Sequence, residues 1–451
     1  MTVSPAPSPV AEGRPGPILY EVNNMALKAG TGIATYARHL GQAAARLGYE
    51  SHGLIGVEGG LAGRDRRLNE ILAFDAARDD VETLLEVALR YARYPFNALG
   101  GIRPAEIPLS GLVVGPTAET YKVFRRLFAA TRLTDAAIGH FSIYGQLAQL
   151  KLEDKPWLFH ATQPVPLAVK GAANVYTIHD LVPLRLPYAT LVKKKYFYRM
   201  LMELARTADH IVTVSEHSKR DIIEFLGIDE RRVTNTYQSV EIPADLLARS
   251  DHDVADDLAK LFGLEFGGYF LFYGAIEPKK NVSRLVDAYA ASGSKLPLVI
   301  AGGGGWQNRG DLRKIRDERF VNFHIDGDIV RRQRKVRRLD YLPRDHLAAL
   351  IRGARAVLFP SIYEGFGLPV IEAMILGTPV VTSNLSSLPE IAGDAALLVD
   401  PYSIEDITRA IRTIEADASL REALAERGRG QARKFSTEAY DGRLRQLYEK
   451  L

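Results

Sequence analysis

The sequence predicts two α/β domains, each built on a doubly wound parallel sheet, that face one another. Three observations predict this fold. A chain of 451 residues favours more than one domain. Short apolar runs, typical of buried parallel strands, alternate with helical patterns in two successive series. A charged segment followed by glycines separates the two series between residues 241 and 268, which is the composition expected of an interdomain linker.

The composition excludes several classes of protein. Net charge is +4 from 58 basic and 54 acidic residues, which is too balanced to favour nucleic-acid binding. The chain has no cysteine, which excludes disulfides and thiolate metal sites. No apolar run approaches the roughly 18 residues of a membrane-spanning helix, and the Pro/Ser-rich start lacks a signal-peptide pattern. We therefore expect a soluble, cytoplasmic protein with a disordered tail over residues 1–16.

The first series predicts a domain over residues 17–243. Gly30-Thr-Gly32 follows its first strand, and residues 61–150 read as helices and loops in no definite order. Helical patterns cover 189–207 and 216–226. The expected strands are Pro17–Val22, Trp157–His160, Asn174–Ile178, Ile211–Val214 and Arg232–Thr236.

The second series predicts a linker over 244–266, a domain over 267–434 and a separately capped helix over 435–451. The expected strands are Tyr269–Tyr273, Leu298–Ile300, Phe320–Phe323, Ala356–Phe359, Val380–Val381 and Leu397–Val399. The expected helices are 281–291, 344–352, 368–376, 404–415 and 419–433.

The most informative motif lies between residues 361 and 372. A strand ends at Pro360, a glycine-containing loop follows, and a helix then begins with Pro369 in its first turn. In α/β folds this junction binds anions, because free backbone N–H groups point outward there. Glu364 and Glu372 flank it, and their carboxylates could accept hydrogen bonds from hydroxyls. Amides for phosphate beside carboxylates for hydroxyls predict a nucleotide-sugar site.

Two further loops follow strands in the same way. Lys279 and Lys280 precede a helix that begins near Asn281, where paired positive charges suit a diphosphate; a solvated Lys-Lys turn is the alternative. Gly32 could let the backbone of the first domain approach a ligand closely, or could serve a tight turn. The four glycines at 302–305 lack the spacing of a dinucleotide-binding turn, so we interpret that loop as mainly structural.

His179 follows the strand 174–178, where an imidazole could contact a sugar hydroxyl or a phosphate. The alternative is a buried, hydrogen-bonded histidine, and both interpretations also apply to His160. Asp326-Gly-Asp328 has the spacing of a carboxylate clamp, but a turn is favoured and no metal is expected. The basic segments 193–199 and 331–338 are either solvated faces or contacts for an anionic acceptor or a membrane surface.

Glu364-Gly-Phe-Gly-Leu-Pro-Val-Ile-Glu372 resembles the E-x7-E signature of retaining glycosyltransferases of family 4, which have the GT-B fold of two Rossmann-like domains. The resemblance covers nearly the whole chain from Pro17. It extends to Gly30–Tyr36, Thr177–Pro183, Val214–Asp221, Gly274–Asn281 and Ser387–Gly393. The chain departs from the family pattern at Ala275, where many members have arginine, and at Tyr237–Val240.

The resemblance implies a role for each matching residue. Glu372 would hold the ribose hydroxyls, and Leu342 would lie beside the base. Glu364 with the Gly365, Phe366, Gly367 and Leu368 backbone would hold the transferred sugar and its phosphate. Lys280 and Lys279 would neutralise the diphosphate, Gly32 would approach the phosphates, and His179 would contact the sugar. His179, Glu364 and Lys280 are the catalytic candidates, with no metal and no cofactor, and the last helix would cross back onto the first domain.

The function implied is retaining transfer of a hexose from a nucleotide-diphosphate sugar to a hydroxyl of a glycan or lipid-linked glycan. The pattern looks most like bacterial mannosyltransferases of polysaccharide biosynthesis, which makes GDP-mannose the expected donor. GDP-fucose, dTDP-rhamnose and UDP-glucose remain alternatives, as does peripheral contact with the inner membrane surface. A nucleotide-sugar epimerase is the rival enzyme. A NAD-dependent dehydrogenase is disfavoured because neither domain opens with a complete GxGxxG, and a sugar-binding module because both glutamates are intact.

Overall fold

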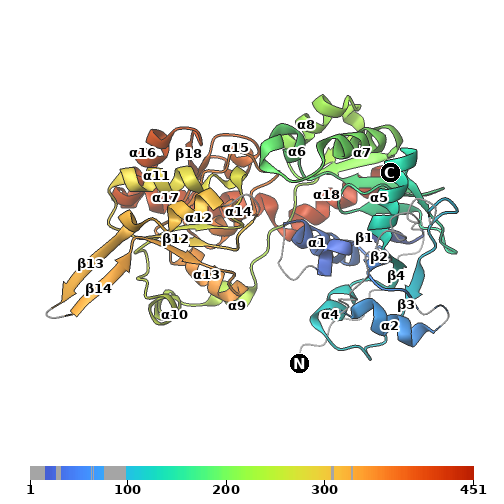
Figure 1. The fold of residues 1–451 in the computed structure, drawn as a ribbon, viewed down its shortest axis with the longest axis horizontal. Coiled ribbons are helices and arrows are strands. Elements are labelled where there is room, and N and C mark those ends of the chain that lie inside the picture. The colour runs from blue at the N-terminus through green and yellow to red at the C-terminus, as the bar shows by residue number, and fades with distance from the viewer. Residues whose placement is uncertain are drawn as a thin grey trace.

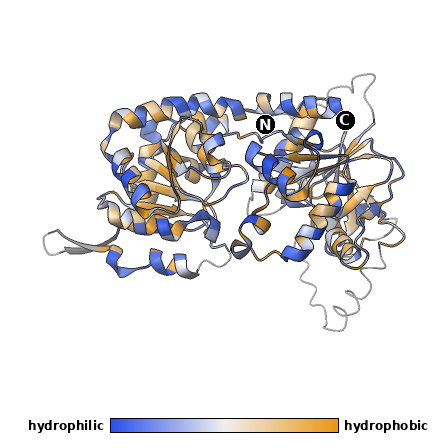
Figure 2. Cartoon of the chain, turned by 90° about the horizontal axis from the view of Figure 1, so that it is seen from above, coloured by the Kyte–Doolittle hydropathy of each residue, from blue (hydrophilic) through white to orange (hydrophobic). Residues whose placement is uncertain are grey.

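The computed structural model describes residues 16–26, 32–61, 63, 65–75, 98–305, 309–326 and 329–451. Nearly all of the expected disordered tail, 1–16, lies outside these residues, as do Gly30 and Thr31. The described chain forms two α/β domains, with hydrophobic strands inside each domain and hydrophilic residues on the outer faces of the helices (Figures 1 and 2). This arrangement is the GT-B architecture that the sequence predicts.

The first domain is built on an eight-stranded sheet in the order β10-β9-β8-β6-β1-β2-β4-β3. Its neighbours pair in parallel, except that the edge strand β3 is antiparallel to β4. The strands are β1 (Ile18–Glu21), β2 (Ser51–Val57), β3 (Ala105–Ile107), β4 (Arg126–Thr131), β6 (Leu158–Ala161), β8 (Ala173–Thr177), β9 (His210–Thr213) and β10 (Val233–Asn235), with β5 (Ala148–Leu150) and β7 (Leu167–Val169) in a small second sheet. The helices are α1 (Gly32–Arg46), α2 (Arg66–Phe74), α4 (Pro116–Tyr121), α5 (Leu133–Tyr144), α6 (Val182–Arg185), α7 (Lys194–Thr207) and α8 (Glu216–Leu226).

The second domain has a six-stranded sheet in which every neighbouring pair is parallel, in the order β15-β12-β11-β16-β17-β18. Its strands are β11 (Phe270–Tyr273), β12 (Leu298–Ala301), β15 (Val336–Leu339), β16 (Ala356–Phe359), β17 (Val380–Ser383) and β18 (Ala396–Val399). Its helices are α11 (Val282–Ser292), α12 (Arg309–Ile315), α13 (Arg344–Arg352), α14 (Leu368–Ile375), α15 (Leu388–Ala392), α16 (Ile404–Ala416) and α17 (Ala418–Ala432). Both sheets reverse their strand order beside the first strand of the domain, as in doubly wound folds.

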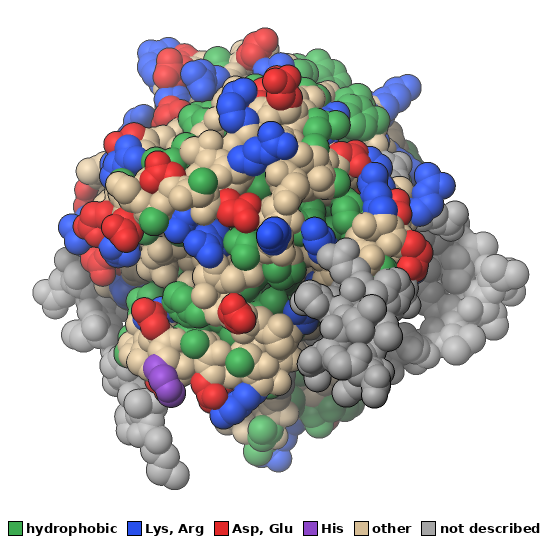
Figure 3. Space-filling model, turned by 90° about the vertical axis from the view of Figure 1, so that its left-hand side faces the viewer, with side chains coloured by type: hydrophobic (Ala, Val, Ile, Leu, Met, Phe, Trp, Pro, Cys, Tyr) green, Lys and Arg blue, Asp and Glu red, His purple; other side chains and the backbone are tan. Residues whose placement is uncertain are grey.

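The strand expected at Phe320–Phe323 does not join this sheet. It forms part of β13 (Val321–Asp326), which pairs antiparallel with β14 (Ile329–Arg334) in a hairpin that projects from the domain (Figure 1). The sheet position is taken by β15, an edge strand in which Val336 is buried. The basic segment 331–338 is therefore divided between the hairpin and the edge strand β15. The arginines of β15 interrupt the apolar pattern by which a parallel strand is recognised in a sequence. Figure 3 shows basic and acidic side chains interspersed on this end of the molecule.

The segment expected as the linker contains helices. α9 (Ala244–Ala248) and α10 (Asp251–Asp257) are followed by a π-helical turn, and this part of the chain packs on α13 of the second domain. Leu258 is fully buried there, and an Nη2 of Arg352 lies 2.8 Å from Oδ1 of Asp251. The connection between the domains is thus held against one of them.

α18 (Thr437–Lys450) crosses back to the first domain, as the sequence predicts (Figure 1). The hydroxyl of Tyr448 lies 2.7 Å from Nδ1 of His160 and 3.1 Å from the hydroxyl of Tyr20. Nε2 of His160 lies 3.0 Å from the hydroxyl of Thr177. His160 is therefore a buried, hydrogen-bonded histidine that ties α18 to the sheet, and the alternative of a ligand contact is not supported.

Burial lowers the pKa of His160 from about 6.5 to about 3, so the folded protein keeps the imidazole neutral. The unfolded chain binds a proton below about pH 6.5, so His160 costs stability as pH falls from 6.5 towards 3. At one pKa unit per 1.36 kcal/mol, we expect the destabilisation caused by His160→Gln to shrink by about 2 kcal/mol between pH 7 and pH 5. Urea unfolding of both proteins at the two pH values measures this, and a pH-independent difference would contradict it.

Candidate active site

The two domains present the carboxyl ends of their strands to a shared region. In a doubly wound sheet, ligands bind where the strand order reverses, at the carboxyl ends of the strands. The reversal lies between β1 and β6 in the first domain and between β11 and β16 in the second. The loops after these strands in the second domain carry Lys279, Lys280 and Glu364.

Glu364 is held by both lysines. Its Oε1 lies 2.6 Å from Nζ of Lys280, and its Oε2 lies 3.5 Å from Nζ of Lys279. The side chain of Glu364 is only 8% exposed, and those of Lys279 and Lys280 are 16% and 13% exposed. Nζ of Lys280 also lies 4.7 Å from the ring centroid of Phe359, at the end of β16. A buried ion pair of this kind needs both partners, because a lone buried charge is costly.

The charges in this cluster shift one another's pKa values. Burial alone would raise the pKa of Glu364, but the positive charges of Lys279 and Lys280 outweigh it and lower that pKa. Burial lowers the pKa of Lys280, and the neighbouring charge of Lys279 acts in the same direction. For Lys279, the carboxylates of Glu364 and Asp180 outweigh burial and raise the pKa. Glu364 is thus ionised, and two cations compete for one carboxylate.

The loop after Glu364 is fixed by two serines that follow β17. The amide of Glu364 donates to the hydroxyl of Ser386 at 3.0 Å. The hydroxyl of Ser387 lies 2.9 Å from the carbonyl of Glu364 and 2.6 Å from that of Phe366. α14 then begins at Leu368. The residue before it, Gly367, has a φ of 122° and has no side chain with which to cap the helix. Pro369 has no N–H, and the amide of Val370 donates to the carbonyl of Gly367 at 3.0 Å. An anion here would therefore be received by the amides just before Pro369, those of Phe366, Gly367 and Leu368.

Glu372 lies in the second turn of the same helix and is half-buried. Burial raises its pKa, and the Tyr273 hydroxyl and the Arg344 charge act in the opposite direction. The hydroxyl of Tyr273 also donates to the carbonyl of Pro369 at 2.7 Å. Leu342, expected beside the base, follows the end of β15 and packs, partly buried, against the hydrophobic core; its contact with a base stays a prediction.

The first domain contributes His179, whose Nε2 lies 2.9 Å from the carbonyl of Thr162. A carbonyl can only accept, so Nε2 carries the proton, and Nδ1 is left as an acceptor. Burial lowers the pKa of His179 and favours this neutral form. The ring of Tyr36 meets the imidazole edge-on with centroids 4.8 Å apart, which fixes its orientation.

Gly365 allows the domains to meet closely, and Gly32 lies at the same contact between them. A Cβ built on Gly365 would lie 2.6 Å from the carbonyl oxygen of His179, which is closer than real Cβ contacts. A Cβ built on Gly32 would lie 3.4 Å from Cδ1 of Leu368. The structure therefore brings Gly32 and His179 of the first domain against the loop from Glu364 to Leu368 of the second.

The structure groups Lys279, Lys280 and Glu364 to Leu368 of the second domain with Gly32 and His179 of the first, whereas His160 lies with α18 instead. The structure adds Asp180 and Glu277, two carboxylates whose charges act on Lys279. Asp180 lies in the motif Thr177–Pro183 and Glu277 in the motif Gly274–Asn281, but the sequence alone does not show that both carboxylates lie near Lys279. Gly302, in the glycine loop interpreted as structural, packs so closely that a Cβ would lie 2.1 Å from the carbonyl oxygen of Gly274. Asp326-Gly-Asp328 lies largely outside the described residues.

The geometry defines a class of protein: a two-domain α/β protein in which a buried cluster of two lysines and one carboxylate lies where the domains meet. The model of the glycosyl transferases group 1 matches residues 265–431, and that of glycosyltransferase family 4 matches residues 114–241. Among curated proteins, O-antigen chain mannosyltransferase B of Escherichia coli is 35% identical over 58% of this chain and 67% of its own length. The chain therefore belongs to the family 4 glycosyltransferases.

Other relatives are similar over part of their length. The MMP alpha-(1->4)-mannosyltransferase of Mycolicibacterium hassiacum is 38% identical over 58% of this chain and 59% of that protein. The serotype-specific mannosyltransferase WbdA of Escherichia coli is 28% identical, and the matched region spans only 32% of it. Among solved structures, Anabaena HepE in complex with UDP and glucose has a TM-score of 0.64 at 14% identity, covering 97% of this chain and 100% of that one. That likeness confirms the GT-B fold.

Proposed function

We propose that this glycosyltransferase moves a mannosyl residue from GDP-mannose to a hydroxyl of a glycan or lipid-linked glycan, with retention of anomeric configuration, in polysaccharide biosynthesis. The observation that carries the proposal is the buried Glu364–Lys280 pair, which stands beside the uncapped start of α14 and opposite His179. Lys280 would supply positive charge for the leaving diphosphate, and Glu364 would supply a carboxylate for the sugar in the same site. Mannose is supported by the names of the relatives, and GDP by the sequence resemblance.

The ion pair suggests how the donor engages. The diphosphate offers Lys279 and Lys280 more negative charge than Glu364 does, and the amides of Phe366, Gly367 and Leu368 would add donors for the same phosphates. The lysines would turn towards the phosphates and release the Glu364 carboxylate to accept hydrogen bonds from sugar hydroxyls. Nδ1 of His179, left as an acceptor, would receive another sugar hydroxyl.

Transfer then needs little chemistry from side chains. The bond between the anomeric carbon and the phosphate oxygen breaks, and the acceptor oxygen bonds to that carbon on the same face. The proton of the acceptor hydroxyl passes to the departing diphosphate. The protein supplies position and stabilises the charge that grows on the leaving group, chiefly through Lys280.

A thermal-shift screen with GDP-mannose, GDP-fucose, dTDP-rhamnose and UDP-glucose tests the donor. A ligand at about one hundred times its dissociation constant adds about 2.7 kcal/mol to the folded state, so the true donor should raise the unfolding temperature clearly. GDP-mannose should give the largest shift. No shift with any nucleotide sugar would overturn the proposal, and release of an epimerised sugar without transfer would favour the epimerase.

Glu372→Ala tests the ribose contact. The variant loses a carboxylate proposed to accept from the ribose hydroxyls, so we expect nucleotide affinity to fall roughly tenfold to a hundredfold, as for hydrogen bonds to a charged group. The fold should survive, because Glu372 is only half-buried. Calorimetric titration with GDP measures the effect. Glu405→Ala, an exposed acid on α16, is the control, and equal affinities of the two variants would contradict the role.

We further propose work at the cytoplasmic face of the membrane, with peripheral contact through residues 193–199. No helix in the described part of the chain is long and apolar enough to span a bilayer. Lys193, Lys195 and Arg199 are exposed, next to the exposed side chains of Leu191 and Tyr198, and this mixture suits anionic headgroups. Sedimentation with anionic vesicles should exceed that with neutral ones, and equal sedimentation would refute the contact.

A further inference from the structure

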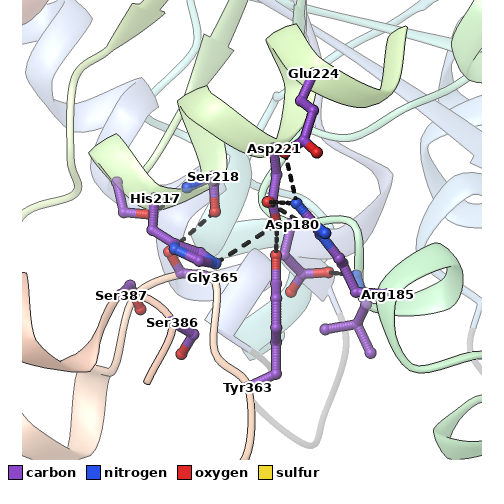
Figure 4. Close-up of polar contacts among 12 residues, drawn as sticks. Asp180, Arg185, His217, Ser218, Asp221, Glu224, Tyr363, Gly365, Ser386 and Ser387 are labelled. Atoms are coloured by element: carbon purple, nitrogen blue, oxygen red, sulfur yellow. Dashed lines mark hydrogen bonds and ion pairs between the residues drawn. The ribbon is translucent and has the colours of Figure 1, made fainter. Parts of the chain in front are cut away.

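The residue before Glu364 reaches into the first domain. Tyr363 donates its hydroxyl to Oδ2 of Asp221 on α8, and both residues are buried, at 6% and 2% exposure (Figure 4). Oδ1 of Asp221 accepts from Nη2 of Arg185 at 2.5 Å and from Nε at 3.1 Å. Nε2 of His217 lies 3.6 Å from Oδ2 of Asp221. The Asp221 carboxylate is thus held by Arg185 of the first domain and accepts a hydrogen bond from the Tyr363 hydroxyl of the second domain.

One turn earlier on the same helix, Ser218 touches both sides of the site. Its hydroxyl lies 3.0 Å from the carbonyl of His179 and 3.3 Å from the carbonyl of Gly365 (Figure 4). Ser218 is fully buried, and its backbone amide donates to Ser215 at the helix cap. The single hydroxyl hydrogen is shared between a carbonyl of the first domain and a carbonyl of the second.

The start of α8 receives a third contact from the second domain. The carboxylate of Glu390, on α15, accepts from the amides of Glu216 at 2.7 Å and His217 at 3.1 Å. These amides would otherwise be unpaired at a helix N-terminus, where a negative charge is also favoured. The first two turns of α8 therefore contact the second domain in three ways. Two backbone amides bind Glu390, the hydroxyl of Ser218 binds the carbonyl of Gly365, and the carboxylate of Asp221 binds the hydroxyl of Tyr363.

We propose that Ser218 and Asp221 are positioning residues for sugar transfer, which set the loop Tyr363–Gly365 in register with His179 when the domains close. The proposal rests on the proposed function. Tyr363 and Gly365 flank Glu364 in the chain, so fixing both neighbours fixes the carboxylate between them. The carbonyl of His179 is fixed by the same serine. Neither Ser218 nor Asp221 is among the residues proposed to hold the donor.

Three sets of these contacts join the two domains: Tyr363 to Asp221, Ser218 to Gly365, and Glu390 to the start of α8. They are lost if the domains separate, so they stabilise the closed arrangement over an open one. A hydrogen bond from a buried hydroxyl to a carboxylate shifts the equilibrium constant between closed and open forms by roughly tenfold to a hundredfold. Removing it should leave donor binding to the second domain intact and reduce the fraction of enzyme closed for transfer.

The experiment compares Tyr363→Phe, Ser218→Ala and the double variant with the full-length wild type. Tyr363→Phe keeps the ring and removes only the hydroxyl. The control is Lys219→Ala on the same helix, because Lys219 pairs with Glu230 within the first domain. The readouts are kcat at saturating donor and acceptor, GDP affinity by calorimetry, and the radius of gyration with GDP-mannose by small-angle X-ray scattering.

We expect Tyr363→Phe to lower kcat about tenfold or more, with GDP affinity within about twofold of wild type and a larger radius of gyration. The double variant should be worse than either single one, and Lys219→Ala should match wild type. Unchanged kcat and radius of gyration in both single variants would overturn the proposal, as would a loss of kcat that merely follows a loss of GDP affinity. If the wild type transfers no sugar, the proposed function fails, and scattering alone still tests the role in closure.

Discussion

Lys280→Ala should lower kcat by about 10²–10³-fold, the magnitude typical of losing a group that stabilises developing charge. Lys280 is the closer partner of Glu364, at 2.6 Å, and it is the cation proposed to stabilise the leaving diphosphate. Its removal leaves Glu364 buried with only Lys279, 3.5 Å away, so the pKa of that carboxyl should rise as well. Initial rates at saturating donor and acceptor measure the effect.

Two further variants make this result specific. Lys280→Arg keeps the positive charge, so it should retain more activity than the alanine variant, although its planar group differs in shape. Lys260→Ala removes an exposed lysine that pairs with nearby Asp256, and it should transfer sugar like the wild type. A Lys280→Ala enzyme with wild-type kcat would contradict the role given to this residue.

Gly365→Ala should stop transfer by keeping the domains apart. The added Cβ would lie 2.6 Å from the His179 carbonyl and 3.0 Å from Cβ of Asp180, and the former is backbone that cannot move aside easily. Displacing the reacting groups by about 1 Å can cost about 10²-fold in rate, so a loss of at least this size is expected. GDP affinity should fall much less than the rate, because Glu372, Lys279 and Lys280, proposed to hold the ribose and the diphosphate, all lie within the second domain.

The matched control for this variant is Gly303→Ala, where an added Cβ meets nothing within 4 Å. Rates of transfer and calorimetric GDP affinities should be measured for both variants. Transfer by Gly365→Ala at the rate of Gly303→Ala would show that close approach at Gly365 is not needed.

The second domain was the easier to predict from the sequence. Its strands are short apolar runs such as Ala356–Phe359, buried on both faces of a parallel sheet, and turn residues bound them. The helix 344–352 of this domain begins and ends as predicted, because its apolar spacing and end residues agree. In the first domain the same holds for the helix 216–226. The E-x7-E motif predicts a candidate site from the sequence alone because its residues lie within one short loop and the helix that follows it.

Elsewhere the sequence carried too little signal. β2 was missed because its seven residues, Ser51–Val57, include a histidine and two glycines, although six of the seven are buried. β15 was missed because two of its four residues, Arg337 and Arg338, are half-buried arginines, which interrupt the apolar run expected of a strand. The pairing of Glu364 with Lys280, 84 residues away, and of Tyr448 with His160, 288 residues away, depends on tertiary packing that no local pattern encodes.

The central claim is that the site between the domains transfers a hexose with retention. The most direct measurement is the anomeric configuration of the product formed from GDP-mannose and a mannose-terminated oligosaccharide, read from the one-bond carbon–proton coupling in nuclear magnetic resonance. Because the donor is an α-glycoside, we predict an α-linked mannoside from the wild type and a product level near background from Lys280→Ala. A β-linked product, or consumption of the donor without any transfer, would contradict the claim.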